Sequence, residues 1–146
     1  MATRKIALVT GASSGIGRQF AMELAQNGYD IVAVARRREL LESFASELQK
    51  FDAQTRVVVA DLSTGAGVQS VIDAAINADF LVLNAGITRA ARVGTIPKDE
   101  IANLNTLLAT GVVEVCEAIV PQMVQRKTGD VVIVSSIAAF TQMPKS

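Results

Sequence analysis

The stretch Ile6-Ala-Leu-Val-Thr-Gly-Ala-Ser-Ser-Gly-Ile-Gly17 joins a short apolar run to a glycine-rich turn. The apolar residues Ile6 to Val9 predict a buried strand, and Ile16, Phe20 and Leu24 recur at the spacing of a helix directly after the turn. A strand, a glycine turn and a helix N-terminus in this order present unpaired backbone N–H groups to a phosphate. The stretch therefore predicts the first crossover of an α/β fold, with an anion site at the turn.

Four more apolar runs follow at regular spacing, with helix-like segments between them. The runs do not alternate apolar with polar residues, so both faces of each strand must be covered, as in a parallel sheet between helices. The predicted fold class is an α/β doubly wound, Rossmann-like sheet with three α/β/α layers and at least five strands. The expected strands are 6–9, 31–35, 57–60, 80–83 and 131–134, and the expected helices are 15–27, 38–50, 67–76 and 99–125, the last with a change of pitch near Pro121.

Composition excludes several classes of function. Lys+Arg 14 balance Asp+Glu 14, which leaves no basic face for nucleic acid or an anionic membrane. The longest uncharged stretch, Val131 to Pro144, is shorter than the roughly 18 residues of a membrane-spanning helix. With no histidine and one cysteine, neither a metal site nor an internal disulfide is expected. We therefore expect a cytoplasmic protein of one domain with a small-molecule ligand.

The glycines follow the spacing Gly-x-x-x-Gly-x-Gly rather than the commoner Gly-x-Gly-x-x-Gly. Short motifs also follow three later strands: Asp61-Leu62, Asn84-Ala85-Gly86 and Ser135-Ser136. In these motifs and their order, the chain from Lys5 onward resembles the short-chain dehydrogenase/reductase family. The resemblance implies an oxidoreductase that interconverts an alcohol and a ketone or aldehyde by hydride transfer with a nicotinamide cofactor. A methyltransferase on the same architecture is the less favoured alternative, because the later motifs argue against it.

The resemblance also implies which residues contact the cofactor. Asp61 and Leu62 would contact the adenine ring, although Asp61 suits a helix N-cap equally well. Asn84, Ala85 and Gly86 would line the ribose on the nicotinamide side, or else form an ordinary turn after the strand. The phosphates would lie on the glycine loop, at Gly11, Ser13, Ser14, Gly15, Ile16 and Gly17.

The residues after the second strand indicate which nicotinamide cofactor binds. An acidic residue there would accept hydrogen bonds from the free ribose hydroxyls and repel a 2′-phosphate, but this chain has Arg36 and Arg37. Guanidinium groups grip phosphate through paired, charge-assisted hydrogen bonds. We therefore expect NADP(H) to be preferred over NAD(H), with Arg36 as the main contact. The alternative is a solvated basic turn.

The resemblance assigns Ser136 to hydrogen bonding with the substrate oxygen, beside a tyrosine that transfers a proton and a lysine that lowers its pKa. Those two positions fall just beyond Ser146, and Tyr29 stands at the wrong end of a strand to replace the tyrosine. Residues 1–146 are therefore expected to form an NAD(P)-binding domain that is incomplete at its C-terminus. If the chain ends there, the alternative is a non-catalytic NADP(H)-binding protein or pseudoenzyme.

The long fourth helix raises two further expectations. The family usually has an asparagine there that anchors a proton-relaying water, and Leu108 occupies that position, with Asn103 and Asn105 able to serve only in a different helix register. The same helix carries more apolar residues than one sheet face needs, and in the resembling family it forms a subunit interface. A homodimer or homotetramer is therefore expected, with a role in the core as the alternative.

Overall fold

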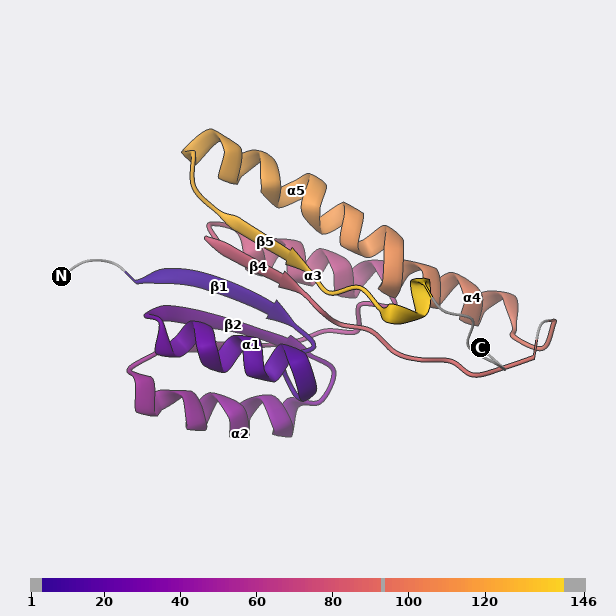
Figure 1. Cartoon of the computed structure of the whole chain (residues 1–146), viewed down its shortest axis with the longest axis horizontal. Helices are drawn as coiled ribbons and strands as arrows, with labels where there is room; N and C mark the ends of the chain where they lie inside the picture. Colours follow the sequence, from indigo (N-terminus) through magenta and orange to yellow (C-terminus); the bar gives the residue numbers. More distant parts are fainter. Residues whose placement is uncertain (1–3, 93, 141–146) are drawn as a thin grey trace.

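The fold is built on a parallel sheet of five strands in the order β3-β2-β1-β4-β5 (Figure 1). The computed structural model describes residues 4–92 and 94–140. The strands are β1 (Lys5–Thr10), β2 (Tyr29–Ala35), β3 (Thr55–Val59), β4 (Phe80–Leu83) and β5 (Asp130–Ile133). Every neighbouring pair is parallel, and Leu8 of β1 stands opposite Val32 on one side and Leu81 on the other. All the predicted strands are confirmed, with small changes in their bounds.

Two layers of helices cover the faces of this sheet, so the predicted three-layer fold is confirmed. On one face, α1 (Gly15–Gln26) and α2 (Arg38–Leu48) pack with residues such as Phe44 against Val9 and Ala33 of the strands. On the other face lie α3 (Gly65–Ala75) and α5 (Gly111–Arg126), whose Val68 and Ile119 share a buried cluster with Leu8. Successive residues of β1 point to opposite clusters, which is why the strand is apolar without alternation.

The long fourth helix has its irregularity earlier than its sequence indicates. It begins as α4 (Lys98–Asn105), passes through a π-helical turn at Thr106–Thr110, and continues as α5 through Pro121. The Thr110 hydroxyl donates to the carbonyl of Asn105 at 3.5 Å, a contact five residues back that suits the wider turn. The expected change of pitch near Pro121 is therefore found at 106–110 instead.

By length and composition, Lys98–Arg126 is the one helix of the described residues that could cross a membrane. Core helices of soluble proteins pass the same test, and here Val115, Ile119 and Met123 lie in the cluster that covers the sheet. Gly111 brings α5 close to α3, because a Cβ there would lie 2.8 Å from Val68 Cγ2. Packing against the sheet thus explains one face of this helix, while Ile101, Val113 and Val124 on the same span are exposed.

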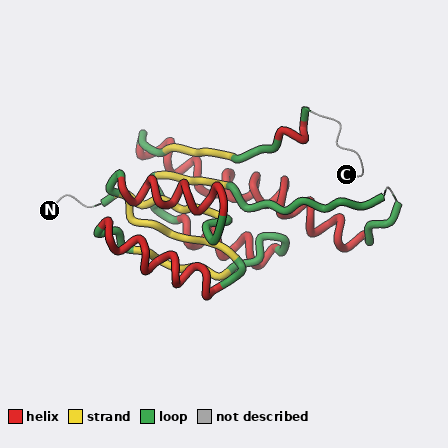
Figure 2. Tube along the Cα trace, turned by 60° about the horizontal axis from the view of Figure 1, so that its bottom comes forward, coloured by secondary structure: helices red, strands yellow, loops and turns green. Residues whose placement is uncertain are grey.

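The ends of the strands leave room for a site. The chain after β4 runs past the strand ends beside α4 (Figure 2), and an ion pair of Arg89 with Glu100 joins the two segments. Open α/β sheets bind ligands in the crevice outside the carboxyl ends of their strands. The strand order places β2 and β3 on one side of β1, and β4 and β5 on the other. A ligand lying across these ends would therefore contact both halves of the sheet.

Candidate functional site

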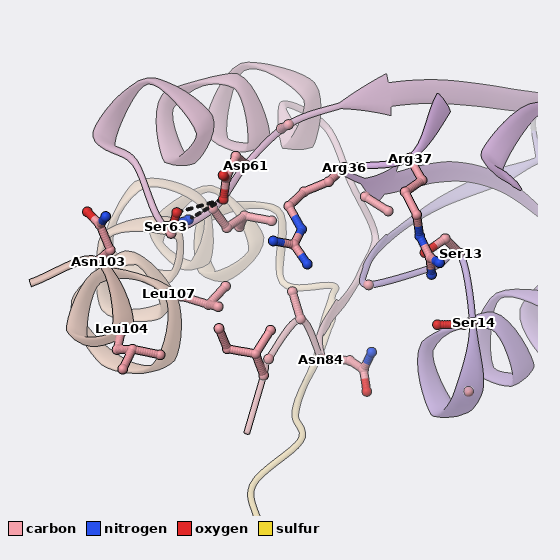
Figure 3. Close-up of a pocket in the computed structure, with 18 of the residues that line it drawn as sticks. Ser13, Ser14, Arg36, Arg37, Asp61, Ser63, Asn84, Asn103, Leu104 and Leu107 are labelled. Atoms are coloured by element: carbon pink, nitrogen blue, oxygen red, sulfur yellow. Dashed lines mark hydrogen bonds between the residues drawn. The ribbon is translucent and has the colours of Figure 1, made fainter. Parts of the chain in front are cut away.

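A pocket of about 540 Å³ lies at the C-terminal ends of β1 to β4, between the glycine loop and α4 (Figure 3). The residues that line it come from the ends of these strands and the loops after them, and from one side of α4 and the π-helical turn that follows. They are Gly11, Ser13, Ser14, Gly15, Ile16, Ala35, Arg36, Arg37, Ala60, Asp61, Leu62, Ser63, Asn84, Ala85, Gly86, Ile87, Glu100, Asn103, Leu104 and Leu107. The pocket thus brings together all the cofactor residues expected from the sequence except Gly17.

The glycine loop is shaped to receive a phosphate. Gly11 and Gly15 have φ of +69° and +57°, in the left-handed region that side chains rarely adopt. A Cβ on Gly15 would meet nothing within 4 Å, so the backbone is open toward the pocket there. Ser14 precedes α1 without capping it through its side chain, which leaves N–H groups of the first turn available to a ligand. These features fit the pyrophosphate of a dinucleotide.

Gly17 packs behind the glycine loop and does not face the pocket. It is buried in α1, and a Cβ there would lie 2.6 Å from the carbonyl oxygen of Gly11 and would also collide with the Asn84 side chain. The glycine therefore allows α1 to pack closely against the turn, as its spacing indicates. It is not among the residues that line the pocket.

Thr10 joins the glycine loop to the loop after β4. Its side-chain oxygen accepts hydrogen bonds from the backbone N–H groups of Asn84 at 2.9 Å and Ala85 at 3.0 Å. The Asn84 side-chain amide donates in return to the Thr10 carbonyl at 3.1 Å. Thr10 is 2% exposed, so these bonds are formed away from water. Asn84 thus fixes the relation between the two loops as well as lining the pocket.

The carboxylate of Asp61 belongs to the pocket and not to a helix cap. Thr64 is the N-cap of α3 and accepts from Gly67 N at 3.0 Å, so the alternative role for Asp61 is not found. Asp61 Oδ1 instead accepts from the Ser63 hydroxyl at 2.7 Å and from its backbone N–H at 3.0 Å. These two bonds hold the pKa of Asp61 below its usual range, against the effect of burial, with a smaller contribution from the charge of Arg36.

The two arginines after β2 both line the pocket. Figure 3 shows Arg36 extending into the pocket, while Arg37 runs on the side where Ser13 and Ser14 lie. Arg38 differs from them, because it begins α2 and forms an ion pair with Glu42 at 3.4 Å. The pocket therefore has a positively charged end next to the glycine loop, where Ser13 and Ser14 also supply hydroxyl groups.

The wall contributed by α4 and the π-helical turn after it was not predicted from the sequence. Glu100, Asn103, Leu104 and Leu107 recur at i, i+3, i+4 and i+7, which is a helix face, and this spacing was the available signal. Asn103 lies at the same end of the pocket as Asp61 and Ser63 (Figure 3). Leu108 lies near the loop after β4 instead, since a Cβ on Gly86 would be 3.4 Å from its Cδ2.

Ser136 follows β5 at the same edge of the sheet but does not line the pocket. Its hydroxyl oxygen accepts from Ala138 N at 3.1 Å and caps a short turn, which leaves the hydroxyl proton free to be donated. Tyr29 begins β2 at the opposite end of the strand, and its ring forms a T-shaped pair with that of Phe80. Among the residues that the structure describes, no group of three or more His, Cys, Asp or Glu side chains could hold a metal ion.

Comparisons with known proteins agree with this geometry. Residues 5–146 match the family model described as short chain dehydrogenase. An uncharacterized oxidoreductase of Myxococcus xanthus is 34% identical over 140 residues, covering 93% of this chain and 55% of that protein. A very-long-chain 3-oxoacyl-CoA reductase of Aspergillus clavatus is 30% identical over 146 residues, covering 94% and 42%. The chain thus spans about half the length of these relatives.

Solved structures show the same likeness. A short-chain dehydrogenase from Sphingobium yanoikuyae in complex with NADPH has a TM-score of 0.88 at 30% identity, covering 94% of this chain and 56% of that one. L-Sorbose reductase from Gluconobacter frateurii, complexed with NADPH and L-sorbose, has a TM-score of 0.89 at 31% identity, covering 98% and 56%. Both neighbours therefore hold a nicotinamide dinucleotide on a fold like this one.

Proposed function

The chain belongs to the short-chain dehydrogenase family, and we propose that it acts in an NADP(H)-dependent oxidoreductase that interconverts an alcohol and a ketone or aldehyde. The observation that carries the cofactor preference is the positive end of the pocket. Arg36 and Arg37 line it, beside a glycine loop that fits a pyrophosphate. The NADPH complexes of the Sphingobium and Gluconobacter proteins support the same assignment.

In this proposal each part of the pocket has a task. The N–H groups at the start of α1 and the loop from Gly11 to Ile16 hold the pyrophosphate, and the arginines neutralise the 2′-phosphate. Asn84, Ala85 and Gly86 line the opposite part of the pocket, where the nicotinamide half would lie. The bound cofactor supplies or accepts the hydride.

Ser136 is proposed to orient the substrate. Its hydroxyl oxygen accepts a hydrogen bond from the Ala138 N–H, which fixes the oxygen and leaves its own proton to be donated. A donor fixed in this way would hydrogen-bond a carbonyl oxygen and stabilise negative charge as it develops there. The substrate is therefore proposed to be a small carbonyl compound or the corresponding alcohol.

A second copy of the chain is the proposed partner. Several large apolar residues of the long helix are exposed, among them Ile101 at 52%, Val113 at 59% and Val124 at 69%. Burying such side chains against a partner would remove apolar surface from water. A homodimer or homotetramer is the assembly that we propose.

The test of the cofactor assignment exchanges one charge. In Arg36→Asp the 2′-phosphate loses a charge-assisted contact and meets a carboxylate, so we expect the dissociation constant of NADPH to rise by about 10- to 100-fold while that of NADH changes little or falls. Arg38→Asp makes the same change of charge outside the pocket and is the matched control. An unchanged preference in Arg36→Asp would refute the assignment. Loss of nicotinamide absorbance with a panel of ketones then separates an enzyme from a protein that only binds the cofactor.

A further inference from the structure

One end of the pocket has apolar walls and a polar edge, which is the chemistry of a site for a flat heteroaromatic ring. Ala60 and Leu62 follow β3 directly. Leu104 comes from α4, and Leu107 comes from the π-helical turn after it. Leu107 is only 8% exposed, so this wall is fixed by packing. The polar edge is made of side chains from both elements, with Asp61 on the β3 side and Asn103 on the α4 side.

The hydrogen-bonding state of Asp61 at this edge is defined by Ser63. Both bonds from Ser63 fall on Oδ1, and within residues 4–92 and 94–140 the structure records none on Oδ2. The bonds also favour the ionised form of the carboxyl group. Asp61 therefore offers a pure hydrogen-bond acceptor to a ligand.

Asn103 is placed to supply the opposite function. Its side-chain amide makes no recorded hydrogen bond to the described part of the chain, although it lines the pocket at the Asp61 end (Figure 3). An amide has an NH₂ group with two donors as well as an acceptor oxygen. The edge thus presents an acceptor from one element and a donor from another.

We propose that Asn103 is a specificity-determining residue that selects adenine at this end of the pocket. This role of Asn103 rests on the proposed function, which places the 2′-phosphate of the adenosine at Arg36 and Arg37. The adenine base then lies beyond the arginines, toward β3. Adenine carries an amino donor next to a ring-nitrogen acceptor, which matches Asp61 and Asn103 together. Hypoxanthine carries a carbonyl acceptor next to an N–H donor, so its oxygen would face the Asp61 carboxylate.

The test measures binding and not turnover. NADPH and its hypoxanthine analogue are titrated against the chain, with fluorescence or heat as the signal, for the unmodified protein, Asn103→Ala and Asn105→Ala. Asn105 lies on the same helix, is exposed, and does not line the pocket, so it is the matched control. For Asn103→Ala we expect the dissociation constant of NADPH to rise about three- to tenfold, as for one lost hydrogen bond. The preference for NADPH over the hypoxanthine analogue should fall by a similar factor, while Asn105→Ala changes neither.

The outcomes separate the two proposals. If the unmodified chain binds NADPH and Asn103→Ala binds it within twofold with the same preference over the analogue, the role of Asn103 is wrong while the proposed function stands. An equal loss in Asn105→Ala would also overturn it, because the effect would then belong to the helix. If the unmodified chain binds neither dinucleotide, both proposals fail. Asn103→Asp, which keeps the size but removes the donor, should lose at least as much affinity as Asn103→Ala.

Discussion

Replacing Thr10 by valine tests whether one buried hydroxyl holds the two halves of the site together. The hydroxyl oxygen accepts from the N–H groups of Asn84 and Ala85 at 2.9 and 3.0 Å and donates to the Val82 carbonyl at 3.4 Å. Valine has nearly the same shape, so no cavity forms. Its methyl group, however, cannot accept a hydrogen bond, and both N–H groups lose their partner.

The expected cost follows from those two donors. A buried donor left without a partner costs about 1 to 3 kcal/mol. The two N–H groups are partly buried, so we expect Thr10→Val to lower the free energy of unfolding by about 2 to 4 kcal/mol. That is a large part of the roughly 5 to 15 kcal/mol that stabilises a domain. Binding of NADPH should also weaken, since Asn84 loses one of its attachments to the loop.

The assay is urea unfolding followed by circular dichroism, with Thr55→Val as the matched control. Thr55 lies on β3, and its hydroxyl oxygen is buried without a hydrogen-bond partner among the described residues. Removing that hydroxyl leaves no group unpaired, so Thr55→Val should leave stability unchanged or raise it. If Thr10→Val costs less than about 1 kcal/mol, or no more than Thr55→Val, then the hydroxyl does not join the loops as argued.

The remaining predictions concern the glycine loop and the acidic edge. Gly17→Ala should destabilise the chain and abolish NADPH binding, because the added Cβ would collide with the Asn84 side chain. Gly65→Ala is the control and should be neutral or stabilising, since a Cβ there meets nothing within 4 Å. Equal stabilities of the two variants in urea would contradict this. Because the pKa of Asp61 is lowered on folding, its contribution to stability is present above the ordinary value of 3.8 and is lost as the pH falls through the folded-state pKa. The difference in unfolding free energy between the unmodified chain and Asp61→Asn should therefore be constant above pH 3.8 and shrink as the pH falls through the folded-state pKa. A difference that stays constant in acid would show that the Ser63 bonds do not stabilise the carboxylate.

The fold could be predicted because its signal is local and repeated. Each strand is an apolar run such as Phe80–Leu83, and each is bounded by a turn and followed by a segment of helical spacing. The π-helical turn at Thr106–Thr110 could not be predicted in the same way. The turn ends directly before Gly111, where the helix passes close to Val68 of α3, and local spacing does not show such an approach between residues far apart in the chain. The prediction falls at Pro121 because the effect of a proline on a helix is local.

The residues of the site also differ in whether a local signal could predict them. Loop residues next to strand ends could be predicted, since the parallel topology alone brings Gly11, Asp61 and Asn84 to one edge. Asn103 and Leu107 share a helical spacing, but the spacing alone does not assign them to the site, because a helix face with that spacing can turn toward the core, the solvent or a ligand. Which face of α4 lines the pocket depends on the path of the chain between β4 and α4. The spacing of residues in the sequence does not give that path.

The contacts behind the glycine loop argue that the site is shaped before a ligand arrives. Asn84 fills the space beside Gly17, and its amide bonds the carbonyl of Thr10, so the loop after β4 supports the turn after β1. The packing of Asn84 beside Gly17 and its hydrogen bond to Thr10 both involve buried or half-buried groups, which are costly to move. Binding energy is then spent on the ligand rather than on ordering the loop. A substitution at Asn84 should therefore weaken phosphate binding at Gly15, although the two residues belong to different loops.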